Sequence, residues 1–102
     1  AHAFDGINIK LMKCGSIDEG KRMIELARKL DMKIMLGCMV ESSVGITAAA
    51  QLAGEVDAAD LDGNLLIDND PYAGIGVEDG RLVLPKGHGL GLSLISDKEN
   101  LL

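Results

Sequence analysis

Apolar segments of two different periodicities alternate along the first 63 residues, and this alternation restricts the possible folds more than any other feature. The run INIKLMKCGS places Ile7, Ile9 and Leu11 at alternate positions, which is typical of a half-buried strand. The next stretch, SIDEGKRMIELARKL, begins with a capping-box pattern at Ser16 and continues with apolar residues at helical spacing. We therefore predict a strand followed by an amphipathic helix over residues 17–30.

The same order then repeats. The apolar run KIMLGCMV is too short for an ordinary helix and predicts a second strand over residues 33–39. Glu41 and two serines supply acidic and capping side chains ahead of VGITAAAQLAGEV, which predicts a second helix over residues 44–56. The segment AADLDG, residues 58–63, is interpreted as a third strand. Strands that alternate with helices through short connections indicate an α/β fold with a parallel sheet.

The second part of the chain differs in composition. Glycine and aspartate become frequent after residue 63, IGVEDGRLVL predicts a hairpin with Asp79 and Gly80 as its turn, and LPKGHGLGL predicts a glycine-rich tail. We predict two parts: residues 1–63 as a strand-helix-strand-helix-strand unit, and residues 64–102 as a carboxyl-terminal hairpin and tail. Three parallel strands alone leave unpaired edges and need cover on both faces. The pattern is best explained as the closing, carboxyl-terminal segment of a (β/α) TIM-type barrel, a fold of about 250 residues.

Charge and composition exclude several classes of partner. The chain has 102 residues, 47% hydrophobic content, a formal net charge of -6 and two aromatic residues, which argues against nucleic acid and anionic membranes as partners. No apolar run approaches the roughly 20 residues of a spanning helix, so we expect a cytoplasmic protein. Cys14 and Cys38 lack zinc-site spacing and are expected to be reduced thiols rather than a disulfide.

Lys10, Asp60 and Asp62 are the candidate residues for chemistry. Lys10 lies on the strand face opposite Ile7 and Ile9, which in a barrel faces the interior, where a low dielectric favours the neutral amine that a general base needs. The alternative is a strand-end lysine that extends to water. Asp60 and Asp62 are two residues apart, so their carboxylates would share one side and could bind a cation, or could be solvated or cap a helix. Pattern alone does not decide between these alternatives.

Four segments considered together point to one family. In order, INIKLMKCGS, LGCMVESSVGITAAAQLA, ADLDGNLLIDNDPYAGIG and LPKGHGLGL resemble the final part of the dipeptide epimerases, of the L-Ala-D/L-Glu epimerase type. These enzymes belong to the muconate-cycloisomerase-like branch of the enolase superfamily. The resemblance extends over about residues 5–92 and implies that the three predicted strands correspond to strands six, seven and eight of the barrel.

The resemblance implies a chemistry and a set of site residues. Dipeptide epimerases invert an α-carbon by two-base 1,1-proton transfer through an enediolate that Mg²⁺ stabilises. Lys10 matches one of the two catalytic lysines. Asp60 and Asp62 match the aspartates that bind the dipeptide ammonium group, and residues Cys38, Met39 and Val40 match a stretch that lines the substrate pocket.

The resemblance also implies that essential parts lie outside these residues. The magnesium ligands and the second lysine belong to earlier strands of the barrel, so we expect no metal ligand in this chain and no activity from it alone. Its expected partners are a dipeptide substrate and either the missing amino-terminal barrel half and cap or other copies of itself. Two alternatives stay open: another enolase-superfamily enzyme, such as a muconate cycloisomerase or o-succinylbenzoate synthase, and an inert fragment that assembles through its strand edges.

Overall fold

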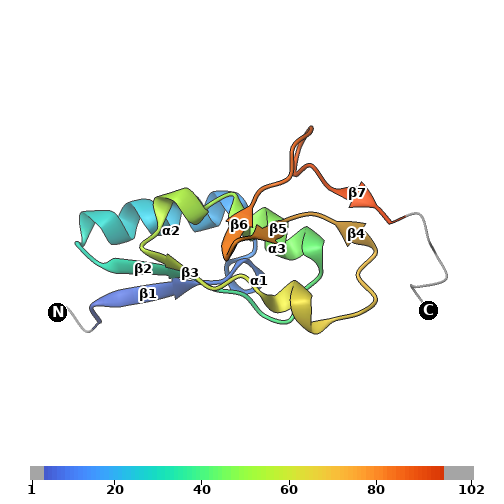
Figure 1. Cartoon of the computed structure of the whole chain (residues 1–102). Coiled ribbons are helices and arrows are strands. Elements are labelled where there is room, and N and C mark those ends of the chain that lie inside the picture. The colour runs from blue at the N-terminus through green and yellow to red at the C-terminus, as the bar shows by residue number, and fades with distance from the viewer. Residues whose placement is uncertain (1–3, 96–102) are drawn as a thin grey trace.

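Three parallel strands form the central sheet of the computed structural model, which describes residues 4–95. All three strands are short: β1 (Gly6–Ile9), β2 (Lys33–Leu36) and β3 (Ala58–Ala59). β2 lies in the middle, with Ile9 opposite Leu36 and Leu36 opposite Ala59. The α/β class and the parallel sheet are therefore confirmed (Figure 1).

Along the chain the helices alternate with the strands, as the sequence pattern predicts. Helix α2 (Ile17–Lys29) follows β1, and α3 (Ser43–Ala50) follows β2. The start of α2 is confirmed, because the Ser16 hydroxyl accepts a hydrogen bond from the Glu19 N–H at 3.0 Å. Within residues 4–95, the longest helix falls short of the length and apolar content that a membrane span requires.

Several elements end earlier than predicted. The prediction that the first strand continues to Leu11 was wrong, because β1 ends at Ile9 and the chain then forms a one-turn helix, α1 (Leu11–Cys14). β2 ends at Leu36 rather than residue 39, and β3 pairs over two residues only. α3 ends at Ala50, and the predicted remainder of the helix is replaced by a 3₁₀ turn, η1 (Ala53–Glu55).

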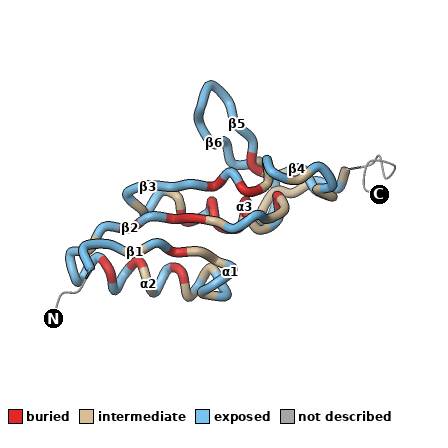
Figure 2. The backbone as a smooth tube through the Cα atoms, turned by 90° about the horizontal axis from the view of Figure 1, so that it is seen from below, coloured by how far each residue is buried: buried red, intermediate tan, exposed pale blue. Residues whose placement is uncertain are grey.

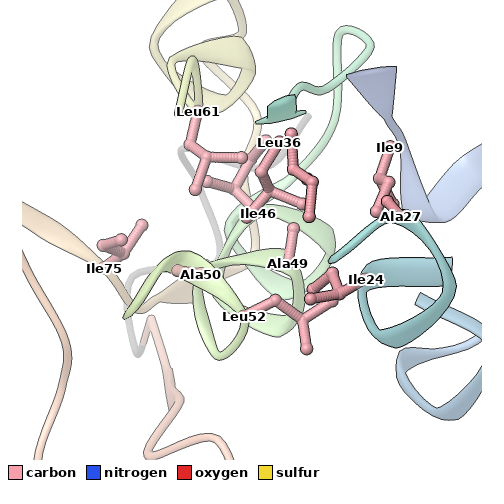
Figure 3. Packing of buried hydrophobic residues seen from close by; sticks show 11 residues of the cluster. Ile9, Ile24, Ala27, Leu36, Ile46, Ala49, Ala50, Leu52, Leu61 and Ile75 are labelled. Carbon is pink, nitrogen blue, oxygen red and sulfur yellow. The ribbon is translucent and has the colours of Figure 1, made fainter. Parts of the chain in front are cut away.

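One face of the sheet is covered and the other is open. Ile9, Ile34 and Leu36 are almost fully buried against α2 and α3 in the cluster that Figure 3 shows, which also contains Ile24, Ala27, Ile46, Ala49, Ala50, Leu52, Leu61 and Ile75. On the other face Asn8, Met35 and Ala58 are exposed. Figure 2, which colours the backbone by burial, has pale, exposed stretches in the strands of the sheet. A parallel sheet is normally covered on both faces, so this open face distinguishes the chain from a complete α/β domain.

The second part of the chain forms small antiparallel pairs. After η2 (Gly63–Leu66), β5 (Gly76–Glu78) pairs with β6 (Arg81–Val83), and β4 (Tyr72–Ala73) pairs with β7 (Ser93–Leu94). The predicted hairpin is confirmed, with Asp79 at φ 50° and Gly80 at φ 77° in its two-residue turn. The pairing of β4 with β7 was not predicted. The last seven residues of the predicted tail, SDKENLL, lie outside the described residues.

Asp57 links helix α2 to the sheet and gives the fold a dependence on pH. Its carboxylate accepts hydrogen bonds from the Ile34 N–H at 2.8 Å and from the Arg28 guanidinium at 2.9 Å. The Ile34 hydrogen bond, and secondarily that of Arg28, lowers the pKa of Asp57 below its ordinary value of 3.8. Ionised Asp57 therefore stabilises the fold above pH 3.8, and this stabilisation is lost as the pH falls toward the lowered pKa.

We expect Asp57→Asn to lower the urea midpoint of unfolding at pH 7 and to have a smaller effect at pH 3, which is below the ordinary pKa of 3.8, so that the unfolded chain binds the proton and part of the stabilisation is lost. Urea titrations of both proteins at the two pH values measure this difference. Glu25→Gln, at an exposed carboxyl on α2, serves as the control for charge removal. Equal effects of Asp57→Asn at both pH values would contradict this role of the carboxylate.

Candidate active site

Lys10, Gly37 and Asp60 lie in one row across the carboxyl ends of the three strands. Each follows the last residue of its strand, and backbone hydrogen bonds of 2.8 Å from Gly37 N to Ile9 O and from Asp60 N to Leu36 O extend the sheet through this row. Neighbouring strands are about 4.8 Å apart, so the backbones of Lys10 and Asp60 are about 10 Å apart. The two ionisable side chains singled out from the sequence therefore share one edge of the sheet.

The Lys10 side chain lies over the open face of the sheet. Lys10 is half-buried, and its Cε is 3.2 Å from the point that a Cβ on Gly37 would occupy. Its stem therefore crosses the end of β2. Among residues 4–95 the ammonium group has no ion-pair partner. Lys10 and Asn8 also border a hollow of about 670 Å³, which α1 and the start of α2 line as well.

Asp60 and Asp62 border a second hollow. The buried Leu61 between them, 4% exposed, points into the core, and the two aspartates on either side are exposed. Both line a hollow of about 500 Å³ between η2 and the β5–β6 hairpin. The prediction of a strand through both aspartates was wrong, because β3 ends at Ala59 and Asp62 directly precedes η2. Lys10 does not line this hollow, so the described residues do not enclose the lysine and the aspartates in one cavity.

The loop formed by Cys38, Met39 and Val40 follows β2 and is held in place by its backbone. Met39 N–H donates a hydrogen bond of 2.9 Å to the Glu41 carboxylate. The Met39 carbonyl lies so close to Gly63 that a Cβ on residue 63 would overlap it. Cys38 Sγ is 3.3 Å from the position that this Cβ would occupy. The side chains of Met39 and Val40 are 44% and 60% exposed. The loop is thus fixed beside the segment that follows Asp62, with two apolar side chains directed outward.

Two carboxylates have positions that the sequence did not reveal. Glu41 was interpreted as an acidic residue at the start of a helix, but it accepts the Met39 N–H instead. The helix cap comes from Asp70, whose carboxylate accepts hydrogen bonds from the Ser43 N–H at 2.7 Å and from the Ser43 hydroxyl, while the N-cap residue Ser42 makes no side-chain cap. Asp70 is 27 residues away in sequence, so no local pattern could identify it.

The chemistry of the donor groups does not fit a metal centre within the described chain. Among residues 4–95, no three His, Cys, Asp or Glu side chains come together in a way that could hold a metal ion. Cys14 and Cys38 are both free thiols. The candidate groups from the sequence that lie near the strand ends are one amine, two carboxylates and the Cys38 thiol.

Comparisons with known proteins agree on the relationship. Residues 1–98 match the family model described as enolase C-terminal domain-like. The L-Ala-D/L-Glu epimerase of Bacteroides thetaiotaomicron is 50% identical over 93 residues, which are 91% of this chain and 24% of that protein. The chain therefore spans about a quarter of the length of this curated relative.

Solved structures show the same relationship. A dipeptide epimerase from Cytophaga hutchinsonii, in complex with Mg and the dipeptide D-Ala-L-Val, matches with a TM-score of 0.80 and 33% identity over 91% of this chain and 27% of that one. An N-succinyl Arg/Lys racemase from Bacillus cereus matches with a TM-score of 0.82 and 30% identity over 98% of this chain and 27% of that one.

Proposed function

Because the chain belongs to the enolase C-terminal domain-like family, we propose that it forms the carboxyl-terminal part of a dipeptide epimerase barrel. In this proposal residues 1–63 supply part of the barrel wall, residues 64–102 supply its closing hairpin and tail, and the protein is cytoplasmic. The observation that carries the proposal is the row of Lys10, Gly37 and Asp60 at the carboxyl edge of a parallel sheet, where barrel enzymes place their active sites.

Lys10 is the proposed general base. Its neutral amine removes the proton from the α-carbon of the carboxyl-terminal residue of a dipeptide, and the electron pair of the broken C–H bond delocalises into the adjacent carboxylate. The amine becomes an ammonium group in this step. Inversion requires that a proton return to the opposite face of the carbon, so a second base must face Lys10 across the substrate. We place that base in the preceding part of the barrel.

Asp60 and Asp62 are proposed to bind the ammonium group of the dipeptide. Their carboxylates flank a buried leucine and border one hollow, an arrangement suited to a compact cation. The backbone distance of about 10 Å from Lys10 to Asp60 is on the scale of a dipeptide in extended conformation, at about 3.4 Å per residue plus side chains. The loop of Cys38, Met39 and Val40 follows β2, the strand between those of Lys10 and Asp60, and would contact the peptide.

The described residues do not fit a Mg²⁺ site. The dipeptide epimerase of Cytophaga hutchinsonii binds Mg. We propose that the equivalent ion in the complete enzyme is held by residues outside this chain, in the partner half of the barrel.

The proposal is tested with the full-length protein that contains this chain. Incubation of Ala-Glu-type dipeptides in D₂O, followed by NMR, should show deuterium at the α-carbon and formation of the second epimer. An N-acetylated dipeptide lacks the ammonium group and is expected to react more slowly. No exchange with any dipeptide would overturn the proposal, and preferential exchange of N-succinyl amino acids would favour the activity named for the Bacillus cereus racemase.

A further inference from the structure

Gly37 and Asn8 surround the stem of Lys10, and we propose that they are positioning residues for its amine. This inference rests on the proposed role of Lys10 as the base. Gly37 has no side chain and therefore leaves space at the end of β2 for the lysine stem. The Asn8 amide on β1 limits the directions that the stem can take.

The first observation is the burial of Gly37. This glycine follows β2 on the open face of the sheet, where Met35 and Ala58 are exposed, yet Gly37 is buried. A Cβ built on it would be 2.6 Å from Asn8 Oδ1, 3.2 Å from Asn8 Nδ2 and 3.2 Å from Lys10 Cε. The two side chains from the neighbouring strand therefore provide the cover of Gly37.

The second observation concerns the reason for a glycine here. Five glycines of the described chain have a positive φ, and Gly37 is not among them. Its backbone conformation is accessible to any L-residue, so the requirement is for space rather than for conformational freedom. The space is filled by the Asn8 amide and the Lys10 methylene groups.

The third observation is the relation between Asn8 and Lys10. They are two residues apart and share one face of the chain, so the Asn8 amide lies on the amino-terminal side of the lysine stem. With that side occupied, the stem extends across Gly37 along the carboxyl edge, in the direction of Asp60. A lysine has four rotatable bonds, and restricting them before substrate binds favours a productive geometry.

The matched test compares Gly37→Ala with Gly54→Ala in the full-length protein. A Cβ at Gly54 would meet nothing within 4 Å, so this control measures the general effect of replacing glycine by alanine. We expect Gly37→Ala to lower kcat for dipeptide epimerisation by about 10- to 100-fold with KM within about 2-fold, since misplacement by about 1 Å can cost that much. Gly54→Ala should change neither. An unchanged kcat for folded Gly37→Ala would overturn the proposal.

A second variant covers the case in which Gly37→Ala does not fold. Asn8→Ala removes atoms and creates no overlap. It should lower kcat by about 3- to 10-fold, less than Gly37→Ala, because only the restraint from the Asn8 amide is lost. A wild-type kcat in Asn8→Ala would count against a positioning role for the amide.

NMR separates failure of this inference from failure of the proposed function. The ¹³Cε resonance of Lys10, assigned by its loss in Lys10→Arg, reports the surroundings of the stem without any turnover. It should shift in Gly37→Ala and Asn8→Ala and stay in place in Gly54→Ala. An unmoved resonance in both variants overturns the positioning role, whereas shifted resonances in a protein that does not exchange dipeptide protons overturn only the epimerase assignment.

Discussion

In the proposed two-base reaction, Lys10→Gln in the full-length protein is expected to stop epimerisation in both directions and to lower α-proton exchange of one epimer by about 10²- to 10⁴-fold. Glutamine retains much of the length of the lysine stem but cannot accept the proton. Because each base serves one face of the α-carbon, the base outside this chain should still exchange the proton of the other epimer. Separate NMR exchange measurements on the two epimers in D₂O test this asymmetry.

Lys13→Gln is the matched control for the loss of a lysine. Lys13 lies three residues further on, in α1, and is exposed, so its replacement should leave both exchange rates within about 2-fold. Equal loss of exchange for both epimers in Lys10→Gln would indicate a structural effect rather than loss of a single base. Full activity of Lys10→Gln would exclude Lys10 as the base.

The sequence predicted the sheet well because the relevant signals are local. The alternation of Ile7 and Ile9 reflects burial of one strand face, and the Ser16 pattern locates the start of α2. Parallel topology then brings the strand ends together, which is why Lys10 and Asp60, from two different strands, lie at one edge in the structure. Strand ends were predicted less well, since the apolar Leu11 continues the alternating pattern after the chain has left the sheet for α1.

The contacts that hold the site in shape could not be predicted, because they join distant segments. Asp70 caps α3 from 27 residues away, and Gly63 at the start of η2 accommodates the Met39 carbonyl of the loop that follows β2. In the sequence, Asp70 belongs to DNDPYAG, which indicates only a turn, and Gly63 belongs to a segment interpreted as strand. Side-chain direction was equally hidden: the sequence places Asp60 and Asp62 two residues apart, but the buried Leu61 is what establishes that both carboxylates lie outside the core.

Asp60→Asn and Asp62→Asn are each expected to raise KM for free dipeptides by about 10- to 100-fold, because a hydrogen bond to a charged group contributes about 1.5–3 kcal/mol and 1.4 kcal/mol corresponds to a factor of ten. The KM for the N-acetylated dipeptide, which has no ammonium group, should stay unchanged in both variants. Steady-state kinetics with both substrates measure the difference.

The control is Asp79→Asn in the hairpin turn, an exposed site at φ 50° where asparagine is well tolerated; it removes the same charge and should leave KM unchanged. If the three variants raised KM alike, overall charge would be responsible. If Asp60→Asn and Asp62→Asn weakened both substrates equally, the carboxylates would support the fold of the hollow rather than bind the cation. Selective loss of the free dipeptide is the one result that requires an ammonium group beside these two carboxylates, and it would also exclude substrates without a cation, such as those of muconate cycloisomerases.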